Sequence, residues 1–265
     1  MKKTLYWTIA ILITLAASVY QRMTGPTYPK HFQVEMDGMN YKFTLPRSAG
    51  TNPIVPLLLK GAPKEMDAYV LWRHYPSHEY FNEIHMTPTK DGLLALLPAQ
   101  PAAGKLEYFI NINGKSYFGD EPLIIRFKGD VPATILIPHI LLMFVAMLFA
   151  CYAGIMAIIK NPTYKKYTLI TAVILFIGGF IFGPLVQHYA FGMYWSGLPF
   201  GTDLTDNKTL FALIAILAAV VTRKWKWNHI VTIIAVLVMF IVFSVPHSVR
   251  GSELNRNTGQ IEVGK

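Results

Sequence analysis

Cysteine is almost absent from this chain, and charged residues are scarce. The single cysteine, Cys151, lies inside an apolar run, so no intrachain disulfide can form and a thiol oxidoreductase with paired cysteines is excluded. Only 15% of the 265 residues are charged, whereas 53% are hydrophobic and the mean hydropathy is +0.37. This composition lies outside the usual range of soluble domains and indicates a membrane protein.

The net charge of +9 does not indicate a nucleic-acid-binding protein. Nucleic-acid binding requires a contiguous basic face, whereas the basic residues here form small groups beside apolar segments. Lysine and arginine in such places follow the positive-inside rule. We therefore expect the lipid bilayer, and no nucleic acid, as a partner. The groups are Lys2-Lys3, Lys160 with Lys165 and Lys166, and Arg223 with Lys224 and Lys226.

The first apolar segment, Leu5 to Tyr20, follows two lysines and spans about 24 Å as a helix, less than a typical bilayer core of about 30 Å. It fits either a signal peptide or a retained anchor. Ala16-Ala17-Ser18 offers a cleavage position, but no clean A-x-A pattern is present. This favours a signal-anchor over residues 1–21.

Four further apolar segments fill residues 131–247 and predict an α-helical bundle of four transmembrane spans. The third segment is the shortest and needs its flanking threonines, Thr209 and Thr222, to cross a bilayer. The predicted segments are Val131 to Ile159, Tyr167 to Tyr189, Leu210 to Val221 with its flanks, and Ile230 to Val245.

Charge predicts the orientation of these spans in a bacterial inner membrane. With a cytoplasmic N-terminus, the loops at 160–166 and 222–228 lie inside, and both are basic. The 190–207 loop and the 248–265 tail then lie outside with the domain at 22–130. Trp225 and Trp227 would lie at the inner interface, and Tyr189, Tyr194 and Trp195 at the outer one.

Residues 22–130 carry a pattern of short strands separated by turn residues, with no helical period. Phe32 to Met36 and Tyr41 to Leu45, for example, flank the turn sequence Asp37-Gly38-Met39-Asn40. Several such strands in succession indicate an all-β sandwich. The fold class predicted for the chain is therefore an extracytoplasmic β-sandwich followed by a four-span helical membrane domain.

The stretch from Leu97 to Ile110 runs from a Pro/Gly turn into a strand that carries Tyr108. It resembles the E–F corner of fibronectin type III-like sandwiches. The layout of the whole chain resembles bacterial inner-membrane proteins that have an Ig-like ectodomain before a small helical bundle. This resemblance implies a location and a binding or docking module, and it names no reaction.

Three histidines of the membrane domain are predicted to lie at one depth, near the outer face. His139 lies eight residues inside its span, His188 near the outer end of the next, and His247 at the end of the last. Ionisable residues in spans usually face the bundle interior, and neutral imidazole binds metals and haem iron. We therefore expect a shared site for haem, zinc or copper. Asp203 is the expected acidic partner, because Asp206 or Asn207 is expected to cap the following helix.

Other residues offer weaker ligand sets. Arg250 and Glu253 follow the last span, where Arg250 either grips an anion such as a haem propionate or serves as an interface anchor. Four methionines of the membrane domain suit copper(I) or simple packing: Met143, Met147, Met156 and Met193. His74, His78 and His85 in the β domain either hold a metal or remain unliganded at the surface.

Three functions remain open. The first is an accessory subunit of a respiratory or other membrane complex, with the histidine site serving electron transfer or assembly. The second is a membrane-embedded hydrolase in which three histidines hold zinc, Asp203 acts as base or ligand and Ser248 or Ser252 assists. The third is a structural docking subunit for a periplasmic partner.

Overall fold

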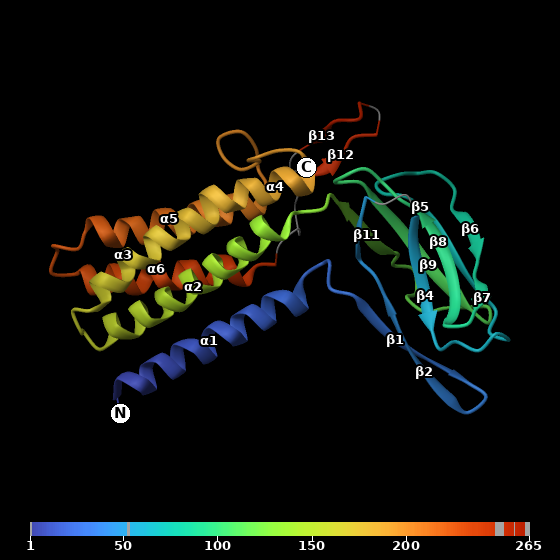
Figure 1. The fold of residues 1–265 in the computed structure, drawn as a ribbon, viewed down its shortest axis with the longest axis horizontal. Helices are drawn as coiled ribbons and strands as arrows, with labels where there is room; N and C mark the ends of the chain where they lie inside the picture. Colours follow the sequence, from blue (N-terminus) through green and yellow to red (C-terminus); the bar gives the residue numbers. More distant parts are fainter. Residues whose placement is uncertain (1, 52–53, 247–251, 257, 263–265) are drawn as a thin grey trace. The chain divides into compact units, whose positions relative to one another are not determined.

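The computed structural model describes residues 2–51, 54–246, 252–256 and 258–262. The chain divides into two compact units, a helical region (α1 to α6) and a β region made of residues 27–130 and 253–262 (Figure 1). The predicted order of an N-terminal apolar helix, a β region over residues 30–128 and a region of long apolar helices is confirmed.

Over the described residues, four helices are long and apolar enough to cross a membrane: α1, α2, the continuous helix Tyr164–Phe191, and α5. The last helix, α6, has 17 residues, at the lower limit of the roughly 17–25 residues that a span requires. The bounds are α1 Lys2–Thr24, α2 Ala133–Ile158, α3 Tyr164–Phe176, η1 Ile177–Phe182, α4 Gly183–Phe191, α5 Leu204–Val221 and α6 Asn228–Ser244.

The continuous helix widens into a π-helix, η1, just before Pro184. A proline inside a helix has no N–H to donate, and its ring clashes with the carbonyl four residues earlier, here that of Phe180. The wider turn avoids this clash, and the Gly183 N–H bonds to the carbonyl of Gly178. Gly178 also allows close approach of α2, because a Cβ there would lie 2.9 Å from the Cβ of Leu142.

Helix α1 packs against α2 and α6 along a narrow face. Ala10 and Thr14 are fully buried in this contact. The Trp7 ring stacks on Tyr152 of α2 with ring centroids 3.9 Å apart. Near the other end, Gln21 Nε2 donates to the carbonyl of Phe243 at 2.6 Å. The contacts of α1 therefore extend along most of its length.

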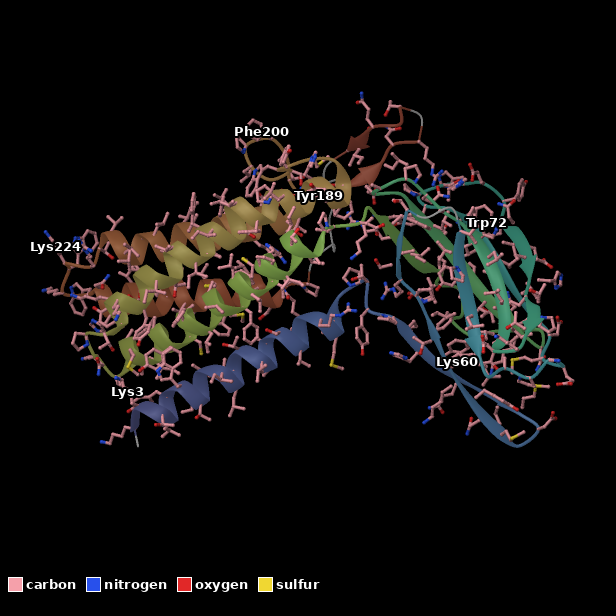
Figure 2. All side chains as sticks on the ribbon, in the orientation of Figure 1. Lys3, Lys60, Trp72, Tyr189, Phe200 and Lys224 are labelled. Atoms are coloured by element: carbon pink, nitrogen blue, oxygen red, sulfur yellow. The ribbon has the colours of Figure 1, made fainter. Side chains whose placement is uncertain are left out.

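The two ends of the helical region differ in charge. Figure 2 shows Lys3 and Lys224 at one end and Tyr189 and Phe200 toward the other. The connection between α2 and α3, which contains Lys160, lies at the same end as Lys3 and Lys224 (Figure 1). All three predicted groups of basic residues thus lie at one end of the bundle.

The described part of residues 30–128 forms three sheets, and the predicted strands Phe32 to Met36 and Tyr41 to Leu45 lie within β1 and β2. A hairpin joins β1 and β2, a six-stranded sheet has the order β3-β11-β9-β5-β6 with β10 beside β9, and a third sheet has the order β4-β8-β7. The bounds are β1 Lys30–Met36, β2 Met39–Leu45, β3 Ser48–Gly50, β4 Ile54–Lys60, β5 Ala68–His74, β6 Asn82–His85, β7 Thr87–Thr89, β8 Gly92–Pro98, β9 Lys105–Ile112, β10 Lys115–Ser116 and β11 Leu123–Lys128.

These sheets share one apolar core. Alternate residues of β9, such as Leu106 and Ile110, pack there with Leu57 of β4 and Leu97 of β8, and all four are fully buried. The period-two pattern of the strands puts these side chains on one face. The predicted β region is confirmed, and its classification as a sandwich stays an interpretation.

Tyr108 makes a contact that its sequence context does not predict. In a tyrosine corner the hydroxyl bonds to backbone a few residues upstream. Here the hydroxyl donates to the carbonyl of Pro46 at 2.8 Å, 62 residues earlier in the chain. Burial raises the pKa of the Tyr108 phenol well above its usual value, so this hydroxyl keeps its proton even in alkaline solution. Tyr108 therefore ties β9 to the segment between β2 and β3.

The tail after α6 adds a small hairpin, β12 (Glu253–Leu254) and β13 (Ile261–Glu262), to the β region. The Leu254 N–H donates to the Ala103 carbonyl at 3.3 Å, and Glu253 forms an ion pair with Lys105. Arg256 Nη2 donates to Gln100 Oε1 at 2.6 Å.

We predict that Tyr108→Phe lowers the free energy of unfolding of the β region by about 1–2 kcal/mol, because the partly buried Pro46 carbonyl loses its donor. Chemical unfolding of the full-length protein in detergent measures the change. Tyr80→Phe is the control, since Tyr80 is 97% exposed and should leave the midpoint unchanged. Equal midpoints for both variants would contradict a stabilising role of the Tyr108 hydroxyl.

Candidate functional site

A cluster of buried polar groups lies where α4, the α4–α5 connection and the first turns of α5 meet. Asp206, only 8% exposed, accepts two hydrogen bonds at Oδ2 from Ser196, one from its N–H at 2.6 Å and one from its hydroxyl at 3.0 Å. Gln187 of α4 donates to the same hydroxyl. One carboxylate thus joins the connection to both helices.

Asp203 caps α5, so the expectation that Asp206 or Asn207 takes this role was wrong. Asp203 Oδ1 accepts from the N–H groups of Thr205 at 2.7 Å and Asp206 at 3.3 Å. These are orphan donors of a helix N-terminus, which a cap satisfies. Asn207 Oδ1 instead accepts from the Leu198 N–H at 2.7 Å. The acid expected to assist a metal therefore has a structural role here.

Lys208 is a buried cation in the second turn of α5, with 7% exposure. Its Nζ donates to the carbonyl of Val245 at 2.5 Å and to that of Pro246 at 3.4 Å. Carbonyls at a helix end lack intrahelical donors, and a lysine there both satisfies them and complements the helix dipole. Lys208 thus joins the start of α5 to the end of α6.

The sequence analysis did not select Gln187, Ser196, Asp206 or Lys208 as functional residues. The sequence does contain a signal for Asp206 and Lys208, because an ionisable residue inside a membrane span costs free energy and usually has a partner within the protein. It was missed because Asp206 or Asn207 was expected only to cap the helix and the apolar span was expected over Leu210 to Val221 with its flanks, whereas α5 begins at Leu204.

His139 is held by the π-helix. Its Nδ1 lies 2.9 Å from the Gly178 carbonyl oxygen, which can only accept a hydrogen bond. Nδ1 therefore carries the proton in the neutral ring, and Nε2 presents its lone pair. Metal-binding histidines typically donate their second N–H to a carbonyl or carboxylate in this way.

His188 lies against Tyr194, with ring centroids 4.2 Å apart and planes inclined by 2°. Its Nδ1 is buried and has no hydrogen-bond partner in the described part of the chain. Gly183, the first residue of α4, lies on the side of this helix that faces His139, because a Cβ on Gly183 would be 3.8 Å from His139 Cε1. His188 lies five residues further on, about 140° around the helix. This geometry does not favour a ligand shared by His139 and His188.

The other predicted ligands are distributed over the chain. His247 and Arg250 lie outside the described residues. Glu253 belongs to the β region, where Lys105 neutralises it. Within residues 2–51, 54–246, 252–256 and 258–262, no group of three or more His, Cys, Asp or Glu side chains could hold a metal ion. Met147 and Met156 pack in different apolar clusters.

The β region has a pocket of about 460 Å³ beside the β5–β6 connection, lined by Arg73, Tyr75, Pro76, Ser77, His78 and Glu107. Glu107 is 4% exposed, and Arg73 Nε donates to its carboxylate. Arg73 also donates to the Glu79 carbonyl at 3.1 Å and lies 4.3 Å from the Phe81 ring centroid. The ion pair therefore holds the connection in place over the sheet.

Two of the histidines expected as ligands in the β region, His74 and His85, have separate carboxylate partners. His74 Nδ1 is 2.9 Å from Glu79 Oε2, and this hydrogen bond holds the pKa of the exposed Glu79 carboxyl below its usual value. His85 instead pairs with Glu83 at 2.9 Å. On the β5–β6 connection, Tyr80 is 97% exposed.

No protein-family model matches the chain, and a comparison with curated proteins gave no match either.

We predict that Asp206→Asn is tolerated in the helical region, whereas Asp206→Ala destabilises it. Asparagine keeps an acceptor for the Ser196 N–H, but alanine leaves two buried donors without a partner, at about 1–3 kcal/mol each. Thermal unfolding in detergent checks this. If the two variants lose stability equally, the negative charge of Asp206, rather than its hydrogen bonds, is what the protein requires.

Proposed function

We propose that the protein is an accessory subunit of the bacterial inner membrane, anchored by its helical region, whose β region docks a partner outside the cytoplasm. The observation that carries this proposal is the β5–β6 connection, which combines a polar pocket with an almost fully exposed tyrosine. Tyrosine is enriched at interface hot spots, so an exposed tyrosine beside a polar pocket suits the anchor of a docked partner.

The distribution of basic residues supports the orientation. The start of α1 and the α2–α3 and α5–α6 connections carry lysine and arginine at one end of the bundle. The positive-inside rule assigns that end to the cytoplasm. The chain enters and leaves the β region through the C-terminal end of α1 and the N-terminal end of α2, at the opposite end of these helices. This favours a β region and a C-terminal hairpin outside the cytoplasm.

The packing of α1 supports a retained anchor over a cleaved signal peptide. Thr14 is fully buried against the bundle, and Gln21 bonds to α6. A segment removed during export would need no complementary surface on helices synthesised after it.

The polar cluster in the helical region supports a structural role better than a hydrolytic one. Asp203 caps a helix, Asp206 holds Ser196, and Lys208 holds the end of α6. A hydrolase needs a base that is free to take a proton from water or a nucleophile. These three charged groups are instead committed to holding helices and connections together.

The orientation of His139 favours a second candidate function, a subunit that binds haem or a metal ion near the outer face. Its Nε2 is presented as a ligand, and the buried Nδ1 of His188 has no partner among the described side chains. Each histidine would then serve with other ligands, because their directions on α2 and α4 differ.

We predict that the protein purified from native membranes in mild detergent elutes in a complex larger than its own 29.8 kDa, and that Tyr80→Ala releases the partner. Truncating a hot-spot aromatic costs about 2 kcal/mol, or roughly thirtyfold in affinity. Light scattering on the eluted species measures its mass.

Met39→Ala is the matched control, since Met39 is 59% exposed at the tip of the β1–β2 hairpin and should leave the complex intact. A wild-type protein that elutes alone, or a complex that survives Tyr80→Ala, would count against docking through the β5–β6 connection.

The second candidate predicts stoichiometric haem or metal in the natively purified protein, with its signal lost in His139→Ala. An absorption spectrum and elemental analysis give the readout. His229→Ala is the control, because His229 lies in the first turn of α6 at the basic end of the bundle. Wild-type protein free of haem and metal after native incorporation would exclude this candidate.

A further inference from the structure

The connection between α4 and α5, residues 192–203, does not extend past the end of the bundle. Figure 1 shows it folding back beside the helices, and Figure 2 shows Phe200 alongside the bundle, set back from Tyr189 near the end of α4. The connection therefore lies at the depth of the helix ends, where a bilayer around the bundle has its interfacial zone.

The side chains that this connection exposes are large and apolar. Phe200 is 83% exposed, Tyr194 55% and Leu198 46%. No charged residue occurs from Tyr189 to Thr202. A connection in water usually presents charged and small polar residues, whereas this composition matches the interfacial belt of a membrane protein.

Most backbone N–H groups in the second half of this connection have acceptors within the protein. From Ser196 to Asp203, five N–H groups have protein acceptors: Ser196 on Asp206, Leu198 on Asn207, Phe200 and Gly201 on the Gly197 carbonyl, and Asp203 on the Ser196 carbonyl. Pro199 has no N–H. Irregular backbone needs such internal partners when water is scarce, as it is near the hydrocarbon.

The shape of the connection is fixed rather than adaptable. Gly197 lies so close to α5 that a Cβ there would be 2.7 Å from the Cβ of Asp206. Trp195 Nε1 donates to the Leu198 carbonyl at 3.0 Å. The buried polar cluster therefore presents Leu198 and Phe200 from a rigid base.

We propose that residues 198–200 form an interfacial membrane element that inserts among the lipid headgroups and upper acyl chains of the leaflet opposite the basic connections. The helix that follows the connection, α5, exposes Phe211 and Ile214 at 50% and 53%, as a lipid-facing helix does. Because the connection joins two helices that are both apolar enough to span a bilayer, lipid is the occupant that we assign to its exposed apolar side chains. The inference rests on membrane insertion and does not require a docked partner.

The test uses the full-length protein with Cys151→Ala, which removes the only cysteine. Phe200→Cys is labelled with an environment-sensitive fluorophore after reconstitution into vesicles of phosphatidylethanolamine and phosphatidylglycerol. Lipids with a nitroxide near the headgroup and aqueous iodide serve as quenchers. Tyr80→Cys is the aqueous reference, and Leu237→Cys, exposed on α6, is the lipid reference. Leu198→Cys provides a second probe, and each variant is required to unfold at the temperature of the Cys151→Ala parent.

We expect the lipid quencher to act several times more strongly on Phe200→Cys and Leu198→Cys than on Tyr80→Cys, with iodide showing the reverse order. Strong quenching by iodide alone would put the connection in water and overturn the proposal. Weak quenching by both agents would mean that protein covers the connection, as a second copy or a partner would, and would overturn it equally. Failure of the Tyr80→Ala complex test would leave this result unaffected.

Discussion

The helical region depends on one constraint, that buried polar groups within or beside hydrocarbon must find partners inside the protein. The Asp206 carboxylate meets this constraint for Ser196, and through Ser196 for Gln187 of α4. Lys208 meets it for the last carbonyls of α6. These bonds connect three helices at one end of the bundle, so the α4–α5 connection takes a single shape. The exposed aromatic residues of that connection depend on this fixed base for their direction.

Much of the architecture follows from the sequence, because a membrane span requires a long apolar run and a strand requires a short run bounded by turn residues. Long apolar runs predicted the helices, and short runs between turn residues predicted β1 and β2 to within two residues at each end. Short strands such as β3 and β7 were not predicted, since three residues are too few to show the pattern of a strand. The N-terminus of α5 was misplaced because Asp203, Asp206 and Asn207 are all competent caps, and only the folded connection decides between them.

The candidate site was less predictable for a geometric reason. Depth in a membrane follows from distance along the sequence, and it placed His139 and His188 near one end of the bundle. The direction in which a side chain points around its helix depends on packing, which the sequence does not give. The π-helix before Pro184 also has more residues per turn than an α-helix, so it changes the direction of His188 relative to the residues that precede it in the same helix. The ion pair of Arg73 and Glu107 was not predicted either. The two residues are 34 positions apart in the sequence and meet only because their strands are neighbours in the sheet.

The packing of α1 also constrains how the protein assembles. Gln21 bonds to Phe243, a partner 222 residues later in the chain. At synthesis rates of about 5–20 residues per second, α1 waits for roughly 10–45 s before α6 exists. During that interval the buried face of α1, with Thr14 at its centre, can contact α2 and, through Trp7, Tyr167 of α3. The contact between α1 and α6 therefore forms only after α6 has been synthesised, and a chain truncated before α6 would leave part of that face of α1 open to quality-control proteases.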